Sequence, residues 1–323
     1  MEKIDAVITW VDGSEPDYQR KLKEYLTDNN TLKRQYFQAN EINLCVASIV
    51  KYAPFIRKIF IVTDKQRPNL DNIKHLVTLD KVEIIDHEEI FRENKDCLPT
   101  FNIRSIDALL FKIKNLSDKF IYFNDDMFLV KETSQEDWFI NNKAVLTGVW
   151  AKTYNKQVIK TISHRIKKFL NVRPSFNAAQ SKAANIVGFH DRYFKSYHCG
   201  RPQIKSVIKS FYDTNPERLK NQIRHKFRDG RQYMPYSLCW HLLIKKNLYV
   251  ESSTNRLVEI TKSKILSAKK LENILIGIDS KADVKFLNIQ DLNIATQETQ
   301  QVFQNWFIKK LSLSLIHISE PTR

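Results

Sequence analysis

Glycine is scarce in this sequence, with only 6 in 323 residues. Neither the G-x-G-x-x-G pattern nor the Walker A pattern occurs. Both patterns use glycine to bring backbone N–H groups close to the phosphates of a nucleotide. The composition therefore argues against a glycine-rich loop that cradles phosphate.

Paired cysteines and long apolar runs are also missing. The cysteines at 45, 97, 199 and 239 are far apart and lack C-x-x-C spacing, so neither a zinc site nor a disulfide framework is indicated. No apolar stretch approaches the length of about 20 residues that a bilayer crossing requires. The chain begins Met-Glu-Lys-Ile-Asp and passes directly into an apolar run, so we expect no signal peptide. Together these features favour a reduced, cytoplasmic setting.

Positive charge is in large excess. The formal net charge is +16, while the hydrophobic fraction of 42% and the charged fraction of 27% are those of a globular protein. Such an excess implies an anionic partner, which could be nucleic acid, an acidic membrane face or a polyanionic substrate. The alternative is that the charge serves solubility alone.

The most informative stretch is an apolar run that stops at two adjacent acids. Phe120 to Phe123 read as a short buried strand, followed directly by Asn124, Asp125 and Asp126. Adjacent carboxylates at the end of a buried strand are costly unless a cation neutralises them. Oxygen ligands suit Mg²⁺ or Mn²⁺, which one or two carboxylates and substrate phosphates can hold together. The sequence therefore predicts a metal–phosphate site, although a polar turn would use the same residue types.

Strand patterns alternate with helical patterns in the first half of the chain, which predicts a mainly parallel, Rossmann-like α/β sheet flanked by helices. In such sheets the ligand lies beyond the carboxyl ends of the strands. An acid lies at or just beyond the end of each of four predicted strands, so these acids could line one rim, although we expect one or two to cap helices. The predicted strands cover residues 4–11, 58–64, 82–86 and 120–123, and the acids at their ends are Asp12, Asp64, Asp86 and Asp125.

Thr100 and Asn102 precede a predicted helix whose apolar face carries Ile106, Leu109, Leu110 and Ile113. The two polar residues could cap that helix or hydrogen-bond a ligand. A last amphipathic helix is predicted over 300–310.

Basic residues gather in the second half of the chain. Residues 154–173 form a predicted basic amphipathic helix, which could lie on an anionic membrane or pack its apolar stripe on the core. His198, Arg201 and Lys205 surround a Gly-Arg-Pro turn, and a second cluster spans 224–228 before an apolar helix over 236–243. Taken alone, each cluster also fits a solvated surface. His241, on the apolar helix, is expected to be a core histidine.

Taken together and in order, these stretches resemble the Stealth family. That family comprises the hexose-1-phosphate transferases of bacterial capsule synthesis and is related to the N-acetylglucosamine-1-phosphotransferase that marks lysosomal enzymes. The resemblance covers 4–14, 47–64 with 98–128, 198–205 and 225–243. Two departures are left unassigned: residues 103–107, where the family more often has a Ser- and Glu-containing version, and Asp229 to Arg231, where relatives tend to carry an acid before the helix.

The resemblance implies a fold of the nucleotide-sugar transferase type and transfer of a sugar-1-phosphate from a UDP-sugar, with a UDP-N-acetylhexosamine as the expected donor. UMP would leave, and a phosphodiester would form on a glycan hydroxyl. It further implies that Asp126 binds Mg²⁺ or Mn²⁺, that Asp125 shares the metal or acts as the base, and that His198 is the other base candidate or a phosphate donor. The remaining implied contacts are Arg228, Arg201 and Lys205 to phosphate, and Trp10, Asp12, Gly13, Thr100, Asn102 and Asn124 to the substrate.

The expected partners are an anionic glycan acceptor and the cytoplasmic membrane face, contacted peripherally, with no nucleic acid. Residues 1–250 would form the catalytic domain, 251–311 a helical accessory region and 312–323 a non-native or disordered tail. Two other functions remain open. A metal-dependent glycosyltransferase would release UDP, and a non-enzymatic polyanion- or membrane-binding protein would show salt-sensitive binding without consuming UDP-sugars.

Overall fold

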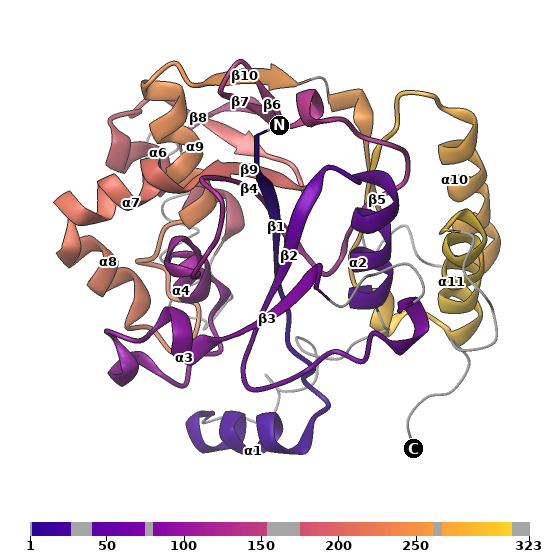
Figure 1. The fold of residues 1–323 in the computed structure, drawn as a ribbon, viewed down its shortest axis with the longest axis horizontal. Coiled ribbons are helices and arrows are strands. Elements are labelled where there is room, and N and C mark those ends of the chain that lie inside the picture. The colour runs from indigo at the N-terminus through magenta and orange to yellow at the C-terminus, as the bar shows by residue number, and fades with distance from the viewer. Residues whose placement is uncertain are drawn as a thin grey trace.

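The structure is a computed structural model that describes residues 2–26, 41–74, 80–153, 175–252, 254–260 and 267–311. Its centre is a five-stranded sheet with the order β3-β2-β1-β4-β9. The first four strands are parallel, and β9 is antiparallel to β4, which confirms the predicted mainly parallel sheet (Figure 1). The strands are β1 (Ile4–Thr9), β2 (Ile56–Thr63), β3 (Val82–Asp86), β4 (Lys119–Asn124) and β9 (Arg201–Ile204).

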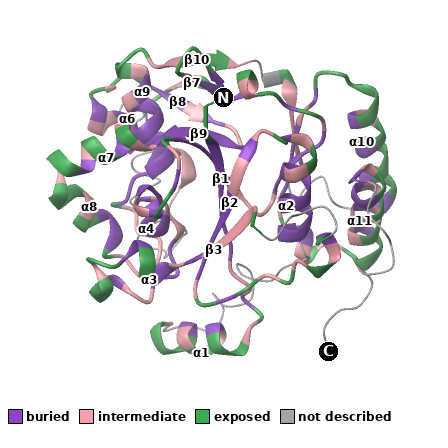
Figure 2. Ribbon diagram, viewed as in Figure 1, coloured by how far each residue is buried: buried purple, intermediate pink, exposed green. Residues whose placement is uncertain are grey.

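The central strands are apolar because both faces of this sheet are covered. Every residue of β1 is buried, and β4 is buried up to its last residue, Asn124 (Figure 2). Asp5 is the acid inside β1, and it is 0% exposed. The guanidinium of Arg57 donates to its two oxygens at 2.9 and 2.6 Å, and the backbone N–H of Ser117 donates at 2.7 Å. The buried charge is thus paired and hydrogen-bonded, as burial requires.

Helices cover the sheet on both sides (Figure 1). One side carries α2 (Glu41–Tyr52), with α10 (Ala268–Ser280) and α11 (Gln297–Leu311) beyond it. The predicted helices near 236–243 and 300–310 are confirmed as α9 (Pro235–Lys245) and α11. The other side carries α3 (His87–Ile90), α4 (Ile103–Asp107), α7 (Lys205–Thr214), α8 (Pro216–Ile223) and α9 (Pro235–Lys245).

The helix predicted through Ile106 to Ile113 is shorter than expected. The structure has the five-residue helix α4, followed by a single 3₁₀ turn at Leu110–Lys112. Backbone bonds three residues apart replace the α-helical pattern, from Leu109 N–H to the Ile106 carbonyl and from Lys112 N–H to the Leu109 carbonyl. The tighter turn keeps Leu109, Leu110 and Phe111 buried, so apolar spacing alone misjudged the length of this helix.

Two smaller sheets complete the described fold. One contains β6 (Phe139–Ile140), β7 (Lys143–Lys152), β8 (Arg192–Ser196) and β10 (Tyr249–Ser252), next to α6 (Phe176–Val187). The other has the order β11-β12-β5, with β11 (Leu257–Ile260), β12 (Phe286–Ile289) and β5 (Met127–Leu129). The region 251–311 was expected to be helical, but it also supplies two strands, β11 and β12, to a sheet whose third strand begins directly after Asp126.

Two expectations fall outside the described residues: the basic helix over 154–173 and the tail over 312–323. Among the described helices, none has the length and apolar character that crossing a membrane requires. All four cysteines are buried and free.

Candidate active site

A cavity of about 710 Å³ opens at the carboxyl edge of the central sheet. It is lined by residues at the end of β1 (Thr9, Trp10), by the turn after β4 (Asn124 to Asp126) and by Arg201 at the start of β9. β1 and β4 are the neighbouring strands at which the strand order reverses, since β2 follows β1 on one side and β4 lies on the other. The cavity therefore lies at the topological switch point, where open α/β sheets bind their ligands.

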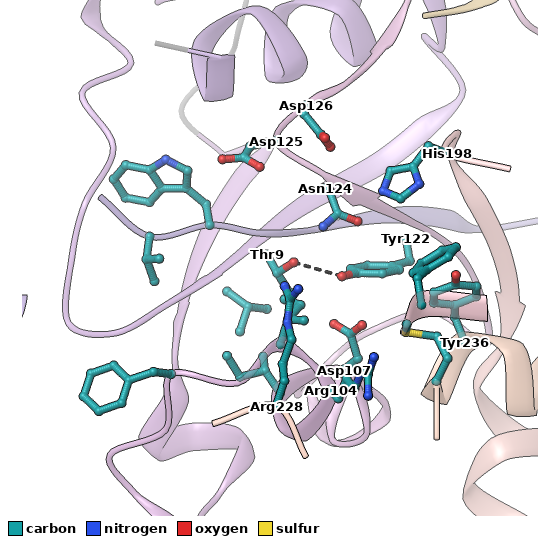
Figure 3. Close-up of a pocket in the computed structure, with 18 of the residues that line it drawn as sticks. Thr9, Arg104, Asp107, Tyr122, Asn124, Asp125, Asp126, His198, Arg228 and Tyr236 are labelled. Atoms are coloured by element: carbon teal, nitrogen blue, oxygen red, sulfur yellow. Dashed lines mark hydrogen bonds between the residues drawn. The ribbon is translucent and has the colours of Figure 1, made fainter. Parts of the chain in front are cut away.

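The acidic turn forms one wall of this cavity (Figure 3). The Asp126 backbone carbonyl accepts hydrogen bonds from Asn288 Nδ2 at 2.8 Å and from Ile289 N–H at 3.3 Å. Its side-chain Oδ1 is buried without a hydrogen-bond partner in the described structure. Burial, reinforced by the charge of Asp125, raises the pKa of the Asp126 carboxyl to about 7. A bound cation would therefore favour the ionised form of Asp126 beside Asp125.

The donor set of the acidic turn fits a hard divalent cation. Two carboxylates beside an amide oxygen, one carboxylate oxygen unpartnered, match the oxygen-only preference of Mg²⁺ and Mn²⁺. Within the described residues, no group of three or more His, Cys, Asp or Glu side chains could hold a metal alone. Such an ion would need further ligands from a substrate, as Mg²⁺ sites that take substrate phosphates do.

Arg201 places a fixed cation beside this turn. Its side chain is 1% exposed, and Nη1 donates to Asn124 Oδ1 at 3.0 Å. The guanidinium lies 4.1 Å from the ring centroid of Tyr236 and 5.7 Å from that of Tyr122. Contact with the face of Tyr236 restricts the guanidinium, which favours directed hydrogen bonds over a mobile charge.

His198 enters the cavity beside Asn124 (Figure 3). Its ring contacts that of Phe176 with centroids 5.2 Å apart, and its backbone N–H donates to Glu259 Oε1 at 2.8 Å. Burial, together with the nearby charge of Arg201, lowers the pKa of the imidazole to about 3. At neutral pH this side chain is therefore uncharged, with one nitrogen as a donor and the other as an acceptor.

A third carboxyl group, that of Asp107, lies across the cavity from Asp125 and Asp126 (Figure 3). Burial raises its pKa to about 7, although a hydrogen bond with Tyr122 and the charges of Arg201 and Arg104 partly offset that effect. Its Oδ1 has no hydrogen-bond partner in the described structure. The Tyr122 hydroxyl is also hydrogen-bonded to Thr9 Oγ1 at 3.0 Å.

Asp107 lies in the stretch 103–107, for which the sequence predicted no role. One signal could have identified it, because it is the only charged residue in the apolar stretch from Ile106 to Phe111. An acid in such a stretch has to be paired or functional.

The structure brings most of the predicted site residues together. His198 and Arg228 line the same cavity as the acidic turn. Thr100 also lines it, and its hydroxyl donates to the His225 carbonyl at 3.4 Å. The predicted residues that line the cavity are Trp10, Thr100, Asn124, Asp125, Asp126, His198, Arg201 and Arg228.

Four predicted residues do not line the cavity. The Asp12 carboxylate accepts from the N–H and hydroxyl of Ser14 at 2.8 and 2.6 Å, and the Gly13 carbonyl accepts from Gln19 Nε2 at 3.1 Å. Both residues thus hold a turn together. Asn102 is 0% exposed and caps α4, accepting from the Arg104 N–H at 3.1 Å.

Lys205 is the fourth, and the antiparallel direction of β9 explains its position. Arg201 pairs with Tyr122 near the carboxyl end of β4, whereas Ile204 pairs with Lys119 at its start. Four residues along an extended strand span roughly 13 Å. Lys205 is therefore carried to the opposite edge of the sheet, where Nζ donates to the Leu116 carbonyl at 3.2 Å.

The other acids at strand ends also have structural partners. Asp64 forms an ion pair with Lys21 at 3.0 Å, and Asp86 caps α3 through a capping box with Glu89. The expectation that one or two of these acids cap helices is confirmed for Asp86. The Asp229 carboxylate, unassigned from the sequence, is bound by the Arg231 guanidinium at 2.8 and 2.9 Å, which lowers its pKa strongly.

Residues after β12 also line the cavity, which the sequence did not predict. They are Gln290, Asp291 and Asn293. Asp291 has a backbone φ of 61°, in the left-handed region that non-glycine residues rarely adopt.

Two family models match this chain. Stealth protein CR1, conserved region 1, matches residues 2–30, and Stealth protein CR2, conserved region 2, matches residues 35–147. The resemblance of 198–205 and 225–243 to later family regions stays a prediction.

Several similar proteins are named polysaccharide phosphotransferases. A capsular polysaccharide phosphotransferase of Actinobacillus pleuropneumoniae is 40% identical over 196 residues, covering 58% of this chain and 49% of the relative. A second, from Haemophilus influenzae, is 30% identical over 248 residues, covering 73% of this chain and 65% of the relative. An exopolysaccharide phosphotransferase of Streptomyces coelicolor is 35% identical over 148 residues, 44% of this chain and 15% of the relative. The chain spans about half the length, or less, of the curated relatives that it matches first.

Solved structures offer only distant likenesses. A galactosyltransferase in complex with donor and acceptor sugar analogues is 9% identical with a TM-score of 0.45, covering 96% of this chain and 97% of that structure. A bifunctional glycosyltransferase, WbbM, is 13% identical with a TM-score of 0.47, covering 96% of this chain and 50% of that structure.

Proposed function

We propose that this chain, which belongs to the Stealth family, transfers a sugar-1-phosphate from a UDP-sugar to a hydroxyl of a cell-surface glycan, releasing UMP. One observation carries the proposal: a single cavity combines an acidic pair, three arginines and two buried groups capable of acid–base chemistry. Its volume of about 710 Å³ lies within the range of small-molecule sites, roughly 300 to 1,000 Å³. The named relatives support the same reaction class.

The aromatic side of the cavity suits the nucleobase of the donor. Trp10, Tyr18 and Phe101 all line it, and the rings of Tyr18 and Phe101 meet edge to face at 5.6 Å and 81°. The flat faces of a uracil ring pack well against such a wall. The acidic turn and Arg201 then lie where the diphosphate would follow.

The divalent ion, when bound by Asp125 and Asp126, supplies positive charge to the diphosphate oxygens. The chain adds its own cations. Arg201 is fixed by its bond to Asn124, and Arg228 lines the same cavity. Preorganised charges of this kind stabilise the extra negative charge that a phosphoryl group carries in its transition state.

The reaction at phosphorus is a displacement. The acceptor oxygen forms a bond to the β-phosphorus of the donor, and the bond from that phosphorus to the bridging oxygen breaks. UMP leaves with the bridging oxygen and the electron pair of the broken bond. Because the bond between the anomeric carbon and its oxygen stays intact, the sugar keeps its anomeric configuration.

Asp107 is the best-placed acceptor for the proton of the attacking hydroxyl. With a pKa of about 7, its carboxyl is both ionised in part and basic enough to take a proton at neutral pH. It also faces the acidic turn across the cavity (Figure 3). His198, with a pKa of about 3, is a weaker base and suits a hydrogen bond to a phosphate or sugar oxygen. Asp125, the other candidate for the general base, is assigned to the divalent ion instead.

The products separate this function from its alternative. The chain would be incubated with a panel of UDP-sugars, Mg²⁺ or Mn²⁺ and a capsule-like acceptor glycan, and the released nucleotide would be identified. UMP, together with a phosphodiester signal in the ³¹P spectrum of the glycan, supports phosphotransfer. Release of UDP and a glycan without phosphorus would instead identify a glycosyltransferase and overturn the proposal.

A further inference from the structure

The acidic turn is held in place by a residue that lies 162 positions later in the chain, on β12. Asn288, in the middle of β12, is 0% exposed, and its Nδ2 donates to the Asp126 backbone carbonyl at 2.8 Å. The N–H of Ile289 donates to the same oxygen at 3.3 Å. Gln290 Nε2 donates to Asn288 Oδ1 at 3.2 Å, which fixes the amide with its nitrogen toward Asp126.

A residue on β11, the strand next to β12, holds the backbone of His198. Glu259, on β11, accepts the backbone N–H of His198 through Oε1 at 2.8 Å. In the parallel pairing of β11 with β12, Glu259 lies directly opposite Asn288. Neighbouring strands are about 4.8 Å apart, and residues in register point to the same face. One position on this small sheet therefore holds two separate segments of the cavity wall.

From this arrangement we infer that Glu259 and Asn288 are paired positioning residues, which set His198 and Asp126 at their working separation. The inference rests on the proposed function, because it assigns Asp126 to the divalent ion and His198 to the substrate. Neither Glu259 nor Asn288 lines the cavity, so they act through the residues that they hold.

The physical reason is that the acidic turn cannot position itself. It joins β4 to β5, and its carboxylates repel each other. Without the Asn288 amide, the Asp126 carbonyl would lose its shorter hydrogen bond and the turn could relax away from the cavity. Residues that orient metal ligands in this way typically contribute 10- to 100-fold to metal affinity or activity.

The experiment compares Asn288→Ala, Glu259→Ala and Glu259→Gln with the wild type in three measurements. They are Mn²⁺ affinity by electron paramagnetic resonance, kcat and KM for the UDP-sugar, and the melting temperature. Asn305→Ala on α11 and Glu272→Ala on α10 are the matched controls, since both side chains are exposed to solvent.

We expect Asn288→Ala to weaken Mn²⁺ binding about 10- to 100-fold. Glu259→Ala should lower kcat by about the same factor, because it displaces His198 from the substrate. It should leave Mn²⁺ affinity unchanged, because His198 is not a metal ligand. Glu259→Gln should restore kcat, since an amide oxygen still accepts the His198 N–H. Both controls should behave as the wild type.

Wild-type Mn²⁺ affinity in a folded Asn288→Ala variant, or full kcat in Glu259→Ala, would overturn the positioning role. If Asn288→Ala does not fold, the two Glu259 variants decide, because that side chain is only half-buried. A wild type that binds no Mn²⁺ would instead overturn the metal assignment in the proposed function.

Discussion

Replacing Asp107 by Asn should make the protein more stable at alkaline pH while removing most of its activity. Asp107 carries a buried carboxyl whose pKa is raised from 3.8 to about 7, chiefly by burial. The folded state therefore binds this proton more tightly than the unfolded state. The contribution of Asp107 to stability is fully present below pH 3.8 and is lost as the pH rises through about 7.

The size of the effect follows from the shift. About three pKa units at roughly 1.4 kcal/mol each give about 4 kcal/mol, the most that ionising Asp107 can cost the folded state. Between pH 5 and pH 8 the wild type should lose about 2 to 3 kcal/mol of this. An Asn side chain has no charge to desolvate, so Asp107→Asn should not show that loss. At about 2 to 4 °C per kcal/mol, the variant should gain roughly 5 °C in melting temperature relative to the wild type on going from pH 5 to pH 8.

The assay is thermal unfolding of both proteins at pH 5 and pH 8, paired with turnover at pH 7.5. Turnover of Asp107→Asn should fall by about 10²-fold or more, the usual contribution of a general base. Asp137→Asn is a control of opposite sign. Burial raises the pKa of Asp137, but a hydrogen bond from Lys285, another from the Ser134 backbone and the charge of Arg256 outweigh it and lower the pKa overall. That variant should be less stable than the wild type at pH 8. If Asp107→Asn were less stable than the wild type at pH 8, or shifted equally at both pH values, the burial argument would be refuted.

Asp125→Asn and Asp126→Asn should each abolish turnover and Mn²⁺ binding without unfolding the protein, as circular dichroism would verify; full activity in both variants would discard the site assignment. Arg201→Lys should lower kcat about 10- to 100-fold, because an ammonium cannot keep the planar stack on Tyr236 while bonding Asn124; an unchanged kcat would show that only charge matters. His241 is 0% exposed, accepts the Phe194 N–H at 3.0 Å and has a pKa lowered to about 4, chiefly by burial. The stabilising effect of neutral His241 should be complete above pH 6.5 and fade as the pH falls through about 4. His241→Ala should therefore destabilise the fold by about 3 kcal/mol at pH 7 and leave Mn²⁺ affinity intact. Loss of Mn²⁺ binding in a folded variant would contradict a core role.

The prediction of His241 as a core histidine is confirmed, because its ring is 0% exposed and both ring nitrogens are hydrogen-bonded inside the protein. Its Nδ1 donates to the Ser237 carbonyl at 2.6 Å while Nε2 accepts from Phe194. The four parallel strands of the central sheet were equally readable, since each is a mostly apolar run that ends in a polar segment. Open α/β sheets bind ligands beyond the carboxyl ends of their strands, which predicted the position of the site. The cavity at the ends of β1 and β4 agrees with that prediction.

What the sequence by itself determined was local: the four parallel strands of the central sheet, the helices near 236–243 and 300–310, and that the two acids after β4 lie at the end of a buried strand. Hydrophobic period and turn chemistry act over a few residues, so they can be read without the fold. Lys205 shows the limit, because only the antiparallel pairing of β9 decides which end of Arg201–Ile204 reaches the cavity.

The tertiary structure alone decided the partners of the acidic turn. Asp107, Glu259 and Asn288 come from distant parts of the chain, and nothing in their local sequence states what they face. Their roles arise from strand register and from burial, which raises the pKa of one carboxyl and turns an amide toward a backbone carbonyl. Such effects depend on which surfaces the folded chain brings into contact, and that is a property of packing over the whole molecule.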